Sequence, residues 1–91
     1  MDISDWRKRI DEVDAKLVDL LSDRSSYVVE IGKIKRRREL AVRDSQREEL
    51  ILGRITRNNK GPIAGDAVAR IFETIIHECI RLEEQLEKNR S

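Results

Sequence analysis

The sequence predicts an all-α fold of three helices, in the order long, short and medium, assembled as a homodimer. Apolar residues recur at spacings of three and four over three stretches, which is the period of a helix that is buried on one face. The first stretch is too long for one chain of 91 residues to cover. We found no internal repeat and no strand pattern. We therefore expect a single domain over residues 1–91 that shares its core with a second copy.

The first expected helix begins at a cap on Ser4 or Asp5 and runs to about Arg38. Residues 6–35 contain no proline, and their only glycine is Gly32. The apolar face consists of Trp6, Ile10, Val13, Leu17, Leu20, Leu21, Val28 and Ile31. A helix of this length spans about 50 Å, whereas a compact globule of this size has a radius of gyration of only about 12 Å. Two such helices are therefore expected to pack together, with Gly32 at a close helix contact.

Two cations interrupt the apolar face of this helix. At about 100° per residue, Arg24 falls between Leu17 and Leu20 in angle, and Lys35 falls within about 20° of Leu17. Because an unpaired buried charge is costly, an anionic group or a water-filled cavity is expected beside them. These two side chains are the main indication of function.

The second expected helix follows a connector over residues 39–44. Ser45 and Glu48 match the S-x-x-E capping box that starts a helix,. Leu50, Ile51 and Ile55 form the apolar face, and Arg47 and Arg54 share its phase. The helix is expected to stop near residues 58–62, where Gly61 can take the left-handed position and Pro62 prevents continuation.

The third expected helix follows Gly65 and has Asp66 as its cap. Its apolar face consists of Val68, Ile71, Phe72, Ile75, Ile76, Cys79, Leu82 and Leu86. Glu83 lies between Phe72 and Ile76 in angle, so its carboxyl is expected to point partly inward. The tail over residues 84–91 is polar and is expected to fray.

Composition excludes several classes of partner. Nineteen cations against eighteen acids leave a net charge of +1, so no global field draws the protein to nucleic acid or a membrane,. The run of four cations at residues 35–38 lies beside Glu39 near a helix C-terminus, where positive charge suits the helix dipole. The N-terminus lacks the apolar core of a signal peptide, and no apolar run has the length of a membrane span. We therefore expect a cytoplasmic protein.

Cofactor chemistry has no support in the sequence. With one histidine, one cysteine and no glycine-rich phosphate loop, no zinc cluster or nucleotide site is expected,. The single cysteine excludes an internal disulfide and fits a reducing compartment. An enzyme built from these residues would need neither metal nor cofactor and would act by substrate placement and charge.

The candidate site residues allow two interpretations. Arg24, Lys35 and Arg47 could converge on one cavity and bind an anion with more than one carboxylate. Alternatively, each cation lays its alkyl stem along the core and keeps its charged end in water. Glu83 could pair with one of these cations, or it could donate a hydrogen bond if it keeps its proton. Glu48 could serve only as the acid of the capping box.

Four segments in order carry a resemblance to a known family. WRKRIDEVDAKLVDLLSDR matches an arginine followed by I-D-x-x-D-x-x-L-x-x-L-L and a second arginine. VVEIGKIK matches V-x-x-I/V-G-x-x-K, VRDSQREEL matches R-D-x-x-R-E, and RIFETII matches the start of the last helix. From about Trp6 to Glu84, the chain resembles the all-helical chorismate mutases, whose intertwined homodimers rearrange chorismate to prephenate on the shikimate route to phenylalanine and tyrosine.

The resemblance implies how the carboxylates and the breaking ether bond are bound. Arg24 and Arg47 would hold substrate carboxylates or the ring face, and Arg43 would assist nearby. Arg7 would reach across the dimer into the partner's site. Lys35 would donate a hydrogen bond to the ether oxygen, where negative charge grows as the carbon–oxygen bond breaks.

The resemblance also implies roles for the remaining acids and for one thiol. Glu48 and the backbone at Asp44 would bind the ring hydroxyl. Cys79 stands where some members have a serine near a carboxylate. Glu83 stands where the best-known bacterial members have glutamine, the second donor to the ether oxygen, so it must be protonated to donate. Activity is then expected to fall with rising pH, and Glu83→Gln is expected to flatten this dependence.

Two other functions are compatible with the same residues. An isochorismate pyruvate-lyase uses a similar cationic site on a related anion, although the ungapped connector between Lys35 and Asp44 favours the mutase. A non-catalytic dimerisation or regulatory module is the other, with a larger shikimate-pathway enzyme as its partner. Such a module should tolerate loss of Arg24 or Lys35 in its function, whereas an enzyme should not.

Overall fold

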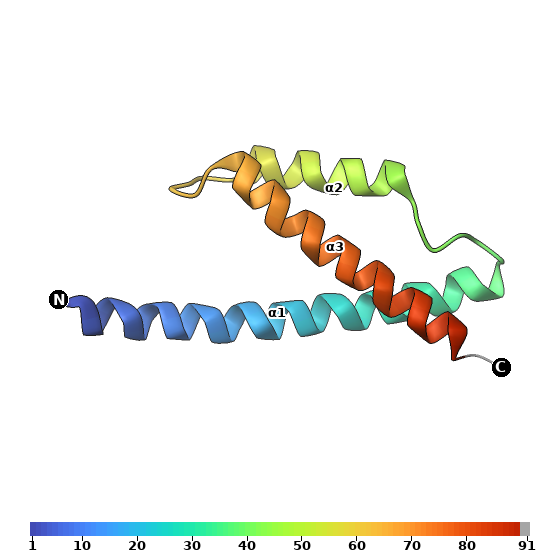
Figure 1. The fold of residues 1–91 in the computed structure, drawn as a ribbon, viewed down its shortest axis with the longest axis horizontal. Helices are drawn as coiled ribbons and strands as arrows, with labels where there is room; N and C mark the ends of the chain where they lie inside the picture. Colours follow the sequence, from blue (N-terminus) through green and yellow to red (C-terminus); the bar gives the residue numbers. More distant parts are fainter. Residues whose placement is uncertain (90–91) are drawn as a thin grey trace.

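The computed structural model describes residues 1–89, and these form three helices (Figure 1). The helices are α1 (Ile3–Arg37), α2 (Ser45–Asn58) and α3 (Gly65–Lys88). The described residues contain no strand, so the all-α prediction and the long, short and medium order are confirmed. None of the helices in this part of the chain is long and apolar enough to cross a membrane.

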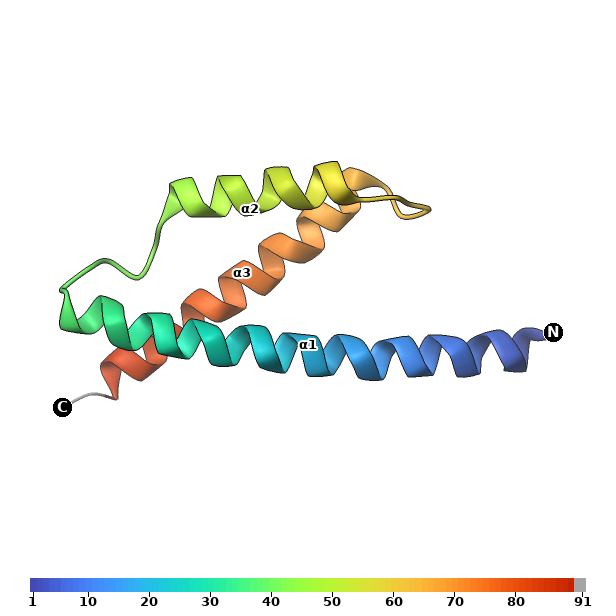
Figure 2. The ribbon, with the colours of Figure 1, turned by 180° about the vertical axis from the view of Figure 1, so that it is seen from behind.

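The three helices form an open arrangement. Figures 1 and 2 show α3 running diagonally from the end of α2 to the C-terminal part of α1. Both α1 and α2 pack against α3, whereas no Cα atom of α1 lies within 8 Å of one in α2. The radius of gyration is 16.4 Å, well above the value of about 12 Å for a compact chain of this length. The helix α3 therefore holds α1 and α2 apart.

The start of α1 differs from the prediction. Its N-cap is Asp2, whose carboxylate accepts a hydrogen bond from the Asp5 amide at 3.1 Å. The Asp5 carboxylate accepts from the Asp2 amide in return, at 3.0 Å. This reciprocal pair is a capping box made of two aspartates,. The expected cap at Ser4 or Asp5 is therefore wrong, because Asp2 satisfies the first-turn amides from an earlier position.

The start of α2 also differs. Asp44 is the N-cap and accepts a hydrogen bond from the Arg47 amide at 3.1 Å, while Ser45 is the first helical residue. The expected capping box of Ser45 and Glu48 is therefore wrong. The reason is that Asp44, with an extended backbone, already fills the capping position. The Glu48 side chain is consequently available for another role.

The third helix begins at Gly65 with Ala64 as its N-cap, and no side chain of the described residues caps it. Asp66 was expected to be that cap, but it lies inside the first turn and accepts a hydrogen bond from Arg70 at 3.2 Å. This hydrogen bond and the positive charge of Arg70 lower the pKa of the Asp66 carboxyl. The helix continues to Lys88, so the expected fraying from residue 84 is wrong this far, and the last part of that prediction, residues 90–91, lies outside the described residues.

The interior of a single chain is very small. Within residues 1–89, Ile76 is the only buried apolar side chain, and the apolar face of α1 is exposed from Ile3 to Leu21, with Leu17 at 52%. The accessible surface of 7580 Å² exceeds by about 2,000 Å² the value of about 5,500 Å² expected for a folded chain of this mass. One copy therefore leaves most of its long helix uncovered.

Gly32 is the one buried residue of α1, all of which the structure describes. A Cβ atom added there would lie 3.6 Å from Cγ of Glu83 and 3.7 Å from its Oε2. The predicted close helix contact is therefore confirmed, and it is made with α3 of the same chain. These are ordinary van der Waals distances, so the backbone of α1 lies close to the Glu83 side chain, and an added methyl group would still fit there.

Candidate active site

The space between α1 and α2 contains a pocket of about 440 Å³, and α3 forms its third side. Seven of the nine predicted site residues line this pocket: Arg24, Lys35, Asp44, Arg47, Glu48, Cys79 and Glu83. They come from all three helices and from the cap of α2. The predicted convergence of three cations on one cavity is therefore what the fold produces.

Lys35 is held at one end of the pocket by two acceptors. Its Nζ donates to the carbonyl of Val42 at 2.7 Å and to Oε2 of Glu83 at 3.4 Å. The two charged side chains are 21% and 8% exposed respectively, so this ion pair is largely shielded from solvent. In this structure Glu83 accepts the hydrogen bond from Lys35, and both side chains face the position that a ligand would occupy.

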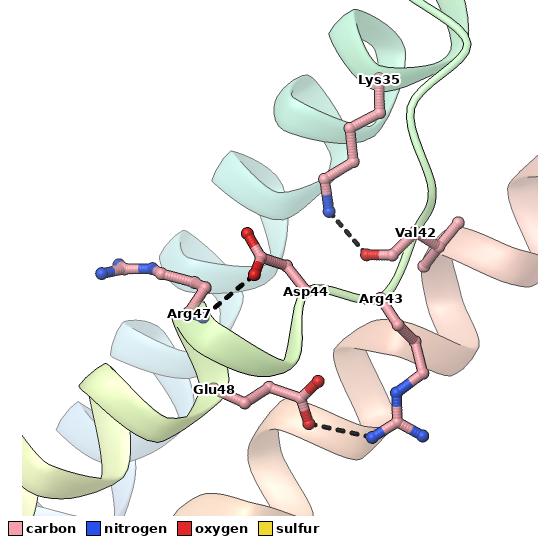
Figure 3. A network of polar contacts seen from close by, with 6 residues as sticks. All are labelled: Lys35, Val42, Arg43, Asp44, Arg47 and Glu48. Carbon is pink, nitrogen blue, oxygen red and sulfur yellow. Dashed lines mark hydrogen bonds and ion pairs between the residues drawn. The ribbon is translucent and has the colours of Figure 1, made fainter.

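The connector after α1 brings Val42 to this lysine. Glu39 adopts a left-handed backbone with φ of 57°, and the Leu40 amide donates to the Lys35 carbonyl at 2.8 Å. A left-handed residue reverses the chain at the end of a helix. The reversal returns the connector across the last turn of α1, where the Val42 carbonyl accepts from the Lys35 ammonium (Figure 3).

Glu48 presents a free acceptor. Its Oε1 accepts from Arg43 at 2.9 Å, and its side chain is 16% exposed. Its Oε2 is buried and, among the described residues, has no hydrogen-bond partner. Because buried carboxylate oxygens are nearly always hydrogen-bonded, this oxygen indicates a donor that a ligand would supply.

Arg24 and Arg47 face the pocket from different helices. Nη1 of Arg24 lies 3.3 Å from Sγ of Cys79, which links α1 to α3 across the pocket wall. Arg47 lies in the first turn of α2 and is exposed. Figure 3 shows the Arg43 and Arg47 side chains pointing in different directions from the start of α2. Because Arg24 and Arg47 reach the pocket from α1 and α2, they can bind separate anionic groups of one ligand,.

Two predicted site residues do not line the pocket. Arg43 contacts it only through Glu48. Arg7 lies seventeen residues before Arg24 on the same helix, a separation of about 25 Å. It therefore lies far from the pocket of its own chain.

Sequence reasoning missed part of the pocket lining. Tyr27 lies at its exposed side, three residues after Arg24, and this helical spacing could have identified it. The carbonyl of Val42 has no sequence signal, because any residue offers one. Aliphatic side chains complete the walls: Val28, Ile31, Ile51, Ile76 and Ile80. Such walls lower the local dielectric constant and strengthen the charge interactions inside.

The amino-acid sequence matches one protein-family model and is similar to several characterised proteins. The sequence model described as chorismate mutase type II matches residues 6–84. A bifunctional chorismate mutase/prephenate dehydratase from Neisseria gonorrhoeae is 38% identical over 80 residues, which are 88% of this chain and 22% of that protein. The chain thus spans less than a quarter of that relative's length. A chorismate mutase from Methanocaldococcus jannaschii is 29% identical over 91% of this chain and 85% of that protein.

Solved structures with a similar fold carry the same family name. Form II of chorismate mutase from Thermus thermophilus superposes with a TM-score of 0.88 and 34% sequence identity, over 90% of this chain and 93% of that one. Form I from the same organism gives a TM-score of 0.82 and 32% identity, over 85% of this chain and 96% of that one.

Proposed function

This chain belongs to the type II chorismate mutase family, and from that membership we propose that it converts chorismate to prephenate as a cofactor-independent homodimer. The observation that carries the proposal is the pocket in which Arg24, Lys35 and Arg47 meet two acidic side chains. Chorismate carries two carboxylates, a ring hydroxyl and an ether oxygen. The pocket offers a suitable partner for each of these groups.

The carboxylates and the hydroxyl would fix the substrate. Arg24 and Arg47 reach the pocket from α1 and α2, so each can bind one carboxylate,. Binding both carboxylates would hold the side chain of the substrate folded over its ring. The free Oε2 of Glu48 would accept the hydrogen bond of the ring hydroxyl. Holding a flexible substrate in its reactive conformation supplies a large part of the barrier reduction for a unimolecular rearrangement.

The breaking ether bond would lie beside Lys35 and Glu83. Negative charge grows on the ether oxygen in the transition state, and a preorganised ammonium stabilises this charge without reorganising. The Val42 carbonyl holds Nζ of Lys35 on one side. The carboxyl of Glu83, 3.4 Å from the same nitrogen, can act as a second donor only when it carries a proton.

The dimer would complete both the core and the site. The surface excess of about 2,000 Å² per chain lies in the range that obligate dimers bury. An antiparallel pair of α1 helices crossing near Leu17 would bring Arg7 of one chain level with Tyr27 of the other, a residue of the pocket lining. The reason is that Arg7 lies ten residues before Leu17 and Tyr27 lies ten after it. Arg7 would then reach the partner's pocket.

The direct test is the absorbance of chorismate in the presence of the purified protein. We expect its absorbance to fall and prephenate to form. The same assay with isochorismate tests the lyase. A folded, dimeric protein that converts neither substrate would contradict an enzymatic role and support a regulatory module with a larger enzyme as its partner, such as the dehydratase to which the Neisseria relative's name joins its mutase.

The pH dependence of the reaction tests Glu83. From the role that the family resemblance implies for Glu83, we expect the mutase activity of the wild type to fall as pH rises, because only a protonated carboxyl can donate to the ether oxygen. The Glu83→Gln variant keeps a neutral donor at every pH, so its profile should be flatter and its activity should exceed that of the wild type at high pH. The measurement is kcat/KM across a pH series from acid to mildly alkaline buffer. A flat wild-type profile together with unchanged activity in the variant would remove Glu83 from the mechanism.

A further inference from the structure

We propose that Arg43 is a positioning residue that acts through Glu48 and does not touch the substrate. This inference rests on the proposed mutase function and deepens it. The resemblance to the family implied that Arg43 assists substrate binding directly, and its contacts indicate a different role. Its side chain lies outside the pocket lining and holds the carboxylate that lies inside.

The ion pair between these residues divides the Glu48 carboxylate into two unequal oxygens. Oε1 accepts from Nη2 of Arg43 at 2.9 Å. Oε2 is buried without a partner within the described part of the chain. Arg43 is 61% exposed whereas Glu48 is 16% exposed. The arginine therefore reaches the carboxylate from the solvent side, and the second, buried oxygen has no partner among the described residues.

This division determines which kind of group can bind. An ion pair with Arg43 requires an ionised carboxylate, and an ionised carboxylate offers only acceptors. Oε2 can then receive a hydroxyl hydrogen but cannot donate one to an ether or a carbonyl. With Oε1 engaged, rotation of the carboxylate would break a charge-assisted hydrogen bond, so the open oxygen keeps one orientation.

The local fold explains why Arg43 can do this. It directly precedes Asp44, the N-cap of α2, and Glu48 lies one helical turn into that helix. The hydrogen bond from the Arg47 amide to Asp44 fixes the backbone between the two partners. Figure 3 shows the Arg43 guanidinium beside the Glu48 carboxylate on the side away from Lys35. The same turn that starts the helix therefore sets the position of its hydroxyl acceptor.

A double-mutant cycle tests the proposal, with kcat/KM for chorismate as the readout. Arg43→Gln should lower kcat/KM about tenfold, within the range of coupling between residues in contact. The single variant Glu48→Gln should lower kcat/KM by more than Arg43→Gln does. Adding Arg43→Gln to the Glu48→Gln variant should then change kcat/KM by less than about twofold. Arg43→Lys keeps a cationic donor and should recover most of the loss. Arg57→Gln, a change of an exposed arginine in the last turn of α2, serves as the control and should leave kcat/KM unchanged.

Three outcomes would overturn the role of Arg43. One is an undiminished loss from Arg43→Gln in the Glu48→Gln background, which would mean that Arg43 contacts the substrate or supports the fold. Another is no loss in the single variant, and the third is no rescue by lysine. Circular dichroism melting of each variant identifies a folding defect. A wild type without mutase activity would overturn the proposed function itself, whereas an active wild type with additive losses would overturn only this inference.

Discussion

Replacing Lys35 with alanine is expected to lower kcat for chorismate by about 10²- to 10³-fold, the usual cost of removing one donor from a developing oxyanion. The ammonium of this lysine is already fixed by a backbone carbonyl and a buried carboxylate, 2.7 Å and 3.4 Å away. Its charge is therefore placed before the substrate arrives. KM should change less than kcat, because the ether oxygen carries much more negative charge in the transition state than in the substrate.

Lys33→Ala is the matched control for this experiment. Lys33 lies two residues away on the same helix, is 53% exposed and pairs only with Glu30 among the described residues, at 3.2 Å. Its loss should leave kcat within about twofold, since exposed ion pairs contribute little. Removing Lys35 also leaves the buried carboxylate of Glu83 unpaired, which costs about 1–3 kcal/mol or more of stability. Melting curves must therefore accompany the rates. A folded Lys35→Ala variant with wild-type kcat would contradict the mechanism.

The helices could be predicted from the sequence because their apolar residues repeat with a helical period. The residues at which the helices begin are harder to predict. Several neighbouring side chains can cap the same turn. Asp2 caps α1 in place of the predicted Ser4 or Asp5, and Asp44 caps α2 in place of the predicted Ser45. The choice depends on which residue has an extended backbone, and the sequence does not state this directly.

The site could be predicted in part for the same reason. Arg24 and Lys35 were identified because a charge in an apolar stripe requires a partner, and both line the pocket. The roles of Val42 and Arg43 depend on how the connector folds back after the left-handed Glu39. Backbone carbonyls and loop paths leave no periodic pattern, so only the structure could place these contacts.

Replacing Leu17 with glutamate is expected to abolish the proposed dimer. Leu17 is 52% exposed in a single chain and lies in the middle of the apolar face of α1. In a symmetric interface every change occurs twice. Losing two buried leucines costs about 1.5–3 kcal/mol each, and the two carboxylates would face each other near the two-fold axis. The dimer dissociation constant should therefore rise at least about 10³-fold.

Loss of the dimer should also unfold the chain and remove its activity. A single copy has Ile76 as the only buried apolar side chain of residues 1–89, which is too small a core to offset the conformational entropy of ordering the helices. Sedimentation velocity would measure the mass, and circular dichroism the helix content.

Ala15→Glu places the same side chain two residues away on the opposite face of α1. That variant should remain dimeric, helical and active. If the Leu17→Glu protein stayed dimeric and active, the long helix would not form the interface, and the partner's Arg7 could not complete the site.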